Sequence, residues 1–206
     1  MEKGTSARAA TGERRRQILD AALHCFAENG YEATTLSQIR DRSGASTGSI
    51  YHLFSSKQEI AGAVYLDGLR EYQKGFLDVI AHRTGAEGVV RACVEYYLQW
   101  VEDNERLARF ILHTRRAELV PAVRDELRTM NRAFFGALAN VIERYVASGD
   151  IKPMPRELFH AVVMGPAHEY TRHWLAGRRR VPLGEALSLL GEASWDAVRT
   201  RERRRG

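Results

Sequence analysis

The sequence is poor in the residues that build covalent or metal-held scaffolds. It has only two cysteines, Cys25 and Cys93, with no Cys-x-x-Cys spacing. No two of its seven histidines are spaced as neighbouring ligands on a helix together with a carboxylate. We therefore expect neither a disulfide framework nor a metal site, and no cofactor. Each cysteine lies on an apolar helical face and is predicted to be a small buried side chain.

Long apolar runs and catalytic motifs are also missing. No stretch approaches the roughly 20 apolar residues that cross a bilayer, and the N-terminus is polar rather than a signal peptide. These absences favour a cytoplasmic protein without a membrane partner. The sequence has no Gly-x-Ser-x-Gly elbow, no phosphate-binding loop and no dinucleotide fingerprint, so an enzyme with catalytic residues is not expected.

What the sequence does have is helical periodicity throughout. Because no segment alternates like a strand, we predict an all-α fold of about nine helices. In chain order, the predicted helices cover residues 13–29, 35–43, 46–54, 56–82 and 86–103, a shorter segment after Asn104, a long one from Pro121 to just before Gly149, and residues 156–177 and 183–201. Residues 1–11 are predicted to be a disordered arm, and residues 202–206 a basic tail.

Positive charge gathers at the two ends of the chain, which carries a net charge of +5. Such a distribution fits an anionic partner at one or both ends, although the last six residues fit a solubilising tail better. Arg14, Arg15 and Arg16 lie at the start of the first predicted helix. They suit either a contact with a nucleic-acid backbone or a solvated surface.

Residues 34–57 predict two short helices joined by a glycine turn. Thr35 is placed as an N-cap, and Gln38 three residues later completes a capping box. Gly44 stands at the left-handed C-cap position that ends the first of the two helices.

A second short helix is predicted to start near Ser46 or Thr47. It buries Ile50 with Leu53 or Phe54 and keeps Ser49, Tyr51 and His52 outside. Ser56 and Glu59 form another capping box, which opens the next helix. Two short helices around such a turn make a helix-turn-helix, whose second helix fits the major groove of DNA.

The first quarter of the chain resembles the DNA-binding domain of TetR-family transcriptional regulators. The positions that carry the resemblance are Arg16, Phe26, Gly30, Thr35, Ile39, Gly44, Gly48, Ile50, Tyr51, Phe54 and Lys57. The resemblance implies a three-helix DNA-binding domain over residues 12–57. It also implies a helical bundle over residues 58–201 that binds a ligand and forms a homodimer.

The resemblance, together with side-chain chemistry, implies the DNA-binding residues. Thr47, Gly48 and His52 are expected at base edges, where Thr47 can bond or touch a thymine methyl. Thr35, Ser49, Tyr51 and Lys57 are expected on phosphates, and Ser46 is either a cap or a reader, with the cap favoured. The reading helix has no Arg, Lys, Asn or Gln between Gly44 and Phe54. Recognition of sequence-dependent DNA shape must therefore contribute to discrimination between operator and other DNA.

Aromatic side chains of the second domain are candidates for contact with the ligand. The predicted ligand-binding residues are Trp100, Phe110, His113, Phe134 and His168. Aromatic stripes at helical spacing more often form plain core, and this interpretation stays open for each residue. The last two helices are expected to pair with their copies in a dimer, with Leu187 and Leu190 at the interface.

These expectations describe a sequence-specific transcriptional regulator on double-stranded operator DNA. We expect a repressor that a small-molecule effector releases from its operator. The alternative is a sequence-tolerant architectural DNA-binding protein that uses its basic ends.

Overall fold

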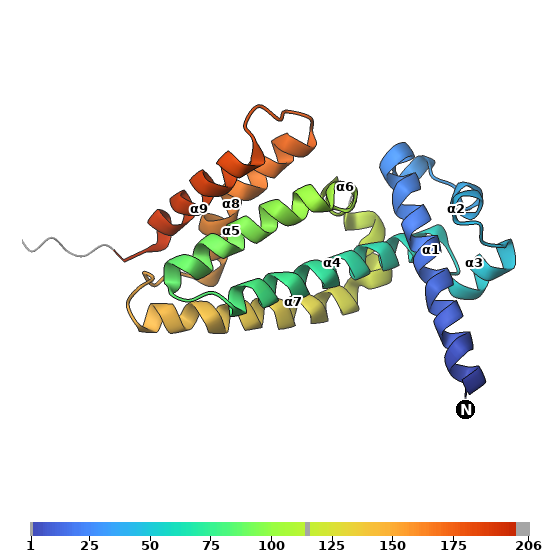
Figure 1. The fold of residues 1–206 in the computed structure, drawn as a ribbon, viewed down its shortest axis with the longest axis horizontal. Coiled ribbons are helices and arrows are strands. Elements are labelled where there is room, and N and C mark those ends of the chain that lie inside the picture. The colour runs from blue at the N-terminus through green and yellow to red at the C-terminus, as the bar shows by residue number, and fades with distance from the viewer. Residues whose placement is uncertain (1, 114–115, 201–206) are drawn as a thin grey trace, which may run out of the picture. The chain divides into compact units, whose positions relative to one another are not determined.

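The computed structural model describes the backbone of residues 2–113 and 116–200, and the side chains of residues 9–112 and 123–200. The described residues form nine α-helices and no strand, which confirms the predicted all-α fold (Figure 1). The helices are α1 (Glu2–Ala33), α2 (Leu36–Ser43), α3 (Thr47–Leu53), α4 (Lys57–Ala81), α5 (Ala86–Asp103), α6 (Glu105–His113), α7 (Arg116–Ala147), α8 (Arg156–Leu175) and α9 (Leu183–Val198).

Two helix starts differ from the prediction. Helix α1 begins at Glu2 rather than near Glu13, so residues 2–11 are helical instead of disordered. Three of the residues in this segment are alanine, the strongest helix former, and they favour continuation of the helix toward the N-terminus. Helix α7 begins at Arg116, before Pro121, which was expected in the first turn. The predicted basic tail at 202–206 lies outside the described residues.

Two compact units make up the chain. One contains Met1–Arg70 and Arg106–Arg128, and the other contains Glu71–Glu105 and Thr129–Gly206. Helices α4 and α7 therefore contribute residues to both units. The division falls inside α4, after Arg70, whereas the sequence placed it after Lys57.

The core of the first unit is built from the apolar faces of its helices. Ile18, Ala22, Cys25 and Phe26 are all buried on the predicted face of α1. The same core contains Ile39, Ala45, Ile50, Phe54, Ile60, Ala61, Val64, Tyr65 and Phe110. Burial of this continuous apolar surface is the main force that holds the short helices α2 and α3 in place.

In the second unit, helix α5 packs against both α8 and α9, and these two pack against each other. Two buried hydroxyl groups find partners there. The Tyr97 hydroxyl lies 2.8 Å from the Thr171 hydroxyl, and Ser194 Oγ donates to the carbonyl of Val163 at 2.9 Å. Satisfied polar groups of this kind fix how the helices pack, because leaving one unpaired would cost free energy.

Helices α4 and α5 approach closely at Gly75 within the second unit. A Cβ atom on Gly75 would lie 2.2 Å from the Tyr96 hydroxyl oxygen. The absence of a side chain lets this hydroxyl donate to the carbonyl of Tyr72 at 3.2 Å. The glycine is thus required for close packing rather than for an unusual backbone conformation.

We predict that Gly75→Ala destabilises the protein although alanine favours helix. The added methyl must displace the Tyr96 ring, and overpacking of this kind typically costs about 1–3 kcal/mol. Gly136→Ala is the matched control, because Gly136 is also inside a helix and a Cβ added there would have nothing within 4 Å. The free energy of unfolding of the Gly136→Ala control should rise by up to about 1 kcal/mol, because alanine has the higher helix propensity. Urea unfolding of the two variants tests this, and equal stabilisation would contradict the packing at Gly75.

Candidate nucleic-acid interface and aromatic cluster

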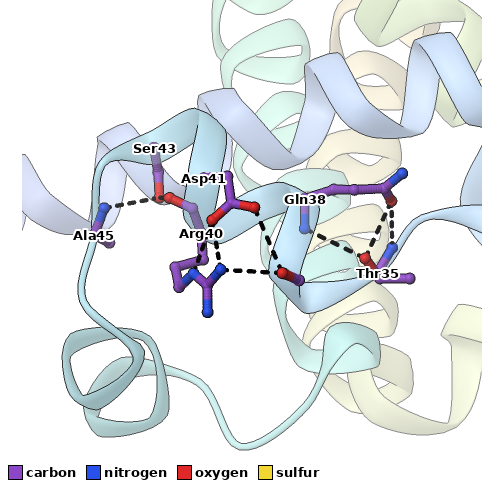
Figure 2. Close-up of polar contacts among 7 residues, drawn as sticks. Thr35, Gln38, Arg40, Asp41, Ser43 and Ala45 are labelled. Carbon is purple, nitrogen blue, oxygen red and sulfur yellow. Dashed lines mark hydrogen bonds and ion pairs between the residues drawn. The ribbon is translucent and has the colours of Figure 1, made fainter.

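Helix α2 has the end structures that the sequence predicted (Figure 2). The backbone N–H of Gln38 donates to Thr35 Oγ1 at 3.3 Å, and the N–H of Thr35 donates to Gln38 Oε1 at 2.8 Å. Gly44 has φ 63°, the left-handed conformation of a C-cap. The capping box and the glycine turn are therefore confirmed, and together they fix where α2 begins and ends.

Side chains on α2 hold its exposed surface and the turn that follows (Figure 2). The Arg40 guanidinium donates to Asp41 Oδ1 at 2.6 Å and to Ser37 Oγ at 3.1 Å. Ser43 Oγ donates to the carbonyl of Arg40 and accepts from the N–H of Ala45, each at 3.2 Å. The serine thereby fixes the chain as it leaves α2.

Ser46 is the N-cap of α3. Its Oγ accepts from the backbone N–H of Ser49 at 3.1 Å and lies 2.9 Å from Ser49 Oγ. Of the two roles that the sequence left open for Ser46, the structure therefore supports the cap.

Helix α3 has only seven residues and is held by side chains at its inner face. Ile50 is 3% exposed, and Phe54, which follows the helix, is 4% exposed. The opposite surface is open to solvent and consists of Thr47, Gly48, Tyr51 and His52. Positions that recur after three to four residues share one face of a helix, so these four residues form a single exposed surface, which we call the α3 face.

Arg42 and Arg15 of the first unit are both paired with carboxylates of the same unit. Arg42 makes a double hydrogen bond with Glu28, at 2.9 and 2.6 Å, which ties α2 to α1. Arg15 pairs with Asp67 at 2.6 Å, and its guanidinium lies 5.9 Å from the Phe54 ring centre. These arginines therefore brace the helices.

Lys57, expected on a phosphate, is the first residue of α4 and points its ammonium group toward the end of α1. Nζ donates to the carbonyls of Tyr31, Glu32 and Thr34 at 2.8, 3.0 and 2.8 Å, and lies 4.6 Å from the Tyr31 ring centre. All three donors of the ammonium are thus occupied. A cation at a helix N-terminus is unfavourable because it opposes the helix dipole. The position of Lys57 at the start of a predicted helix was therefore the sequence signal that its ammonium has other stabilising partners.

Thr34 is a structural residue that the sequence reasoning missed. Gly30 breaks α1 with φ 79° and ψ 161°, as predicted from its position. The buried Thr34 hydroxyl lies 2.7 Å from the carbonyl oxygen of Gly30 and 3.0 Å from that of Cys25. A threonine shortly after a helix-breaking glycine is the signal that could have indicated this role.

The start of α4 differs in detail from the predicted capping box. The N–H of Glu59 donates to Ser56 Oγ at 3.1 Å, as expected, but Glu59 Oε2 accepts from the N–H and the hydroxyl of Ser55, both at 2.7 Å. The hydrogen bonds from Ser55 lower the pKa of the Glu59 carboxyl below its usual range. The reciprocal contact is therefore made one residue earlier than predicted.

Aromatic rings gather around Tyr72 in the second unit. We call this group the aromatic cluster; it consists of Tyr72, Phe76, Tyr96, Tyr97, Trp100 and Phe134. Trp100 meets Tyr72 edge-on with ring centres 4.9 Å apart. The surrounding rings desolvate the Tyr72 hydroxyl and raise its pKa well above its usual range. Trp100 and Phe134, both predicted ligand residues, are thus part of one apolar group.

Two histidines extend the aromatic cluster along α8. The ring of His168 lies 4.8 Å from that of Tyr97 and 5.7 Å from that of His160. Although His168 has exposed surface, desolvation and the neighbouring His160 lower its pKa to about 4. Desolvation also lowers the pKa of His160. Both imidazoles are therefore neutral at pH 7, each with one hydrogen-bond donor and one acceptor.

Phe110, another predicted ligand residue, does not join this cluster. Phe110 stacks on Phe26 with ring centres 5.3 Å apart and is 5% exposed in the core of the first unit. Its periodicity signalled burial correctly but could not indicate which core it enters. The side chain of His113 lies outside the described residues.

Neither a metal site nor a membrane span appears in the part of the chain that the structure describes. No group of three or more His, Cys, Asp or Glu residues there is placed to hold a metal ion. No helix there is long and apolar enough to cross a bilayer.

Comparisons with known proteins agree with this architecture. Residues 18–64 match the family model for bacterial regulatory proteins of the tetR family. The chain is 31% identical over 131 residues to the HTH-type transcriptional repressor Rv1474c of Mycobacterium tuberculosis, covering 58% of this chain and 67% of the relative.

Solved structures share the fold over most of the chain. A TetR family transcription regulator from Marinobacter aquaeolei VT8 superposes with a TM-score of 0.77 at 22% identity, covering 94% of this chain and all of that one. The transcriptional regulator FadR of Bacillus subtilis, solved in complex with stearoyl-CoA, gives a TM-score of 0.75 at 20% identity, covering 88% and 98%. The chain belongs to the tetR family of DNA-binding transcriptional regulators.

Proposed function

We propose that the protein is a homodimeric repressor that binds a near-palindromic operator and is released from it by a small-molecule effector. The α3 face is the observation that carries the DNA-binding part of this proposal. It presents small and hydrogen-bonding side chains on a helix that is capped at one end and anchored by Ile50 and Phe54. A surface of this kind fits the major groove.

The exposed side chains of the α3 face divide by chemistry. Thr47 and His52 offer donors and acceptors for base edges, and Gly48 allows close approach. Tyr51, which is 58% exposed, offers a hydroxyl to a phosphate. The hydroxyls of Thr35 and Ser49 already take part in capping contacts, so their contribution to phosphate binding is the smaller one.

We assign Lys57 a positioning role instead of a phosphate contact. Its three carbonyl bonds connect the end of α1 with the start of α4. DNA binding would then depend on Lys57 through the placement of these helices.

Exposed apolar side chains on α8 and α9 support a dimer formed by these helices. Leu158 on α8 and Leu189 on α9 are each 56% exposed. Leu187 and Leu190, the positions chosen from the sequence, are half-buried, and Leu187 lines a groove beside α5. Pairing with a second copy would cover the exposed leucines. Two α3 helices would then read major grooves separated by about one DNA turn, roughly 34 Å.

The aromatic cluster supports an effector site in the second unit. We propose Trp100, Phe134 and His168 as ligand-contacting residues there, since an apolar surface with a few polar groups suits a small organic ligand. The FadR relative, with its bound stearoyl-CoA, is an example of a ligand-bound protein of this fold. An effector changes DNA affinity only by its difference in affinity for the two conformations. Helix α4 has residues in both units, and we propose that a shift of this helix carries the effect of ligand binding to the DNA-binding helices.

The repressor role is supported by the similarity to the Mycobacterium tuberculosis repressor. A protein that acts on operator DNA works in the cytoplasm of a bacterium, and we place this one there. Turnover of a bound compound would show an additional enzymatic role, and binding without sequence preference would favour the architectural alternative.

The first prediction on DNA binding separates base reading from phosphate contact. After selection of an operator from random duplex DNA, Thr47→Ala and His52→Ala should narrow the affinity gap between operator and random duplex. Tyr51→Phe should weaken both by similar factors, because a phosphate contact carries no sequence information. Fluorescence anisotropy measures these affinities. An unchanged affinity gap in both Thr47→Ala and His52→Ala would remove the α3 face from the interface.

The second concerns Lys57. Lys57→Ala should lower the free energy of unfolding by about 1–3 kcal/mol, because hydrogen bonds from a charged group are lost. Lys74→Ala is the control, since exposed Lys74 pairs with Asp78 one turn away on the same helix. Urea unfolding gives the stability, and DNA affinity against salt concentration gives the number of ionic contacts. If stability is unchanged and the slope of log affinity against log salt concentration falls by about one, Lys57 is instead a phosphate contact.

The third concerns the dimer. Leu189→Glu should yield a monomer that no longer binds operator, because burying an unpaired carboxylate costs several kcal/mol. Leu112→Glu is the matched control, since Leu112 is similarly exposed, at 48%, but lies on α6. Analytical ultracentrifugation measures the mass of both. A Leu189→Glu protein that sediments as a dimer would place the interface elsewhere.

A further inference from the structure

A surface groove in the second unit shares only Tyr96 with the aromatic cluster. It is built from the last turn of α4 and the segment after it, α5 and the start of α9. Its volume is about 550 Å³. The lining residues are Val79, Arg83, Arg91, Glu95, Tyr96, Gln99, Gly184, Leu187 and Ser188. This volume lies within the range of small-molecule sites.

The two arginines of the groove are loosely paired. Arg83 lies 3.6 Å from a Glu95 oxygen, and Arg91 Nε lies 3.4 Å from a Glu87 oxygen. Other arginine–carboxylate pairs in the chain are close, such as Arg15 with Asp67 at 2.6 Å. Well-formed charge-assisted hydrogen bonds are about 2.7–2.9 Å long. Both arginines can therefore gain by binding an additional anionic group.

Arg91 carries a further sign of an incomplete site. Its Nε atom is buried and has no hydrogen-bond partner among the described residues. The stem of the side chain packs against α9, since a Cβ on Gly191 would lie 3.7 Å from Arg91 Cγ. Packing thus holds the Arg91 side chain in the groove, while its Nε has only the 3.4 Å ion pair with Glu87 and no well-formed hydrogen bond. A buried donor without a good hydrogen bond costs free energy.

Apolar surface lies beside the arginines. Val79, Leu187 and the Tyr96 ring line the same groove. The lining therefore combines two cations and one carboxylate with an apolar wall. An anionic head group with an apolar tail matches both parts.

We propose that this groove binds a small amphiphilic anion, whose carboxylate or phosphate group is held by Arg83 and Arg91 and whose apolar tail lies on Val79, Tyr96 and Leu187. An arginine guanidinium pairs with either oxyanion through two parallel hydrogen bonds. Gln99 and Ser188 supply neutral hydrogen-bonding groups at the same lining.

The effect on DNA binding rests on the proposed function of the protein as an effector-controlled repressor. Tyr96 belongs both to the groove and to the aromatic cluster, and its hydroxyl donates to the carbonyl of Tyr72 on α4. A ligand tail against Tyr96 therefore acts on the contact at Gly75, where α4 and α5 approach closely. The groove is thereby placed to bias the position of α4.

Isothermal titration calorimetry of the full chain with decanoate, decyl phosphate and decanol tests the proposal. At least one of the two anions should bind saturably and at least about tenfold more tightly than neutral decanol, the factor expected from one charge-assisted contact. The stronger of the two anions identifies the head group. Arg83→Gln should remove most of this preference. Arg180→Gln, an exposed arginine of the same unit outside the groove, should leave it unchanged.

Three binding results would overturn the proposal. The first is that neither anion binds saturably, and the second is that decanol binds as tightly as the anions. The third is that Arg83→Gln and Arg180→Gln lose the preference for the anion to the same extent. A change in sedimentation of Arg83→Gln alone would also overturn it, because the groove would then be covered by a second copy of the chain. Operator binding is measured on the same preparations without ligand. Operator binding that persists while the anions fail to bind rejects the groove alone and leaves the proposed repressor function standing.

Discussion

Burial of two side chains behind a very short helix is the constraint on which the DNA-binding unit depends. Helix α3 has seven residues, too few to be stable alone in water. Ile50 and Phe54 enter the same core as Ile18 and Phe26, and that burial holds the exposed side chains in register. The Ser46 cap fixes the chain before α3, and the hydrogen bonds of Lys57 fix it after α3. Together they restrict how the helix can rotate on the core.

Local features of the fold could be predicted from the sequence because they depend on interactions between residues that are close in the chain. The Thr35 capping box, the Gly44 turn and the helix break at Gly30 depend on residues within three or four positions of one another. The ends of α4 and α5 and the start of α6 were predicted to within one residue in the same way. The start of α1 was not predicted because the small and polar residues near its beginning resembled a disordered arm, although the alanines there favour helix.

Long-range contacts were not predictable from one sequence. Periodicity showed that Phe110 is buried but not that it stacks on Phe26, 84 positions earlier. Lys57 has the residue type of a phosphate contact, yet carbonyl groups 23 to 26 positions earlier accept the hydrogen bonds that its ammonium donates. Trp100, Phe134 and His168 were identified by type and do gather in one unit. The loosely paired arginines of the groove give no signal before α5 and α9 are packed together.

The buried thiols have a consequence for chemical stability. Cys93 lies within the packed face of α5, and burial raises its pKa to about 12. Burial also raises the pKa of Cys25 in the first unit. The thiolate is the reactive form of cysteine, and at pH 7 a thiol of pKa 12 is ionised in about one molecule in 10⁵. Peroxide and alkylating agents therefore find almost no nucleophilic sulfur at Cys93 while the chain is folded, and labelling of that residue reports unfolding.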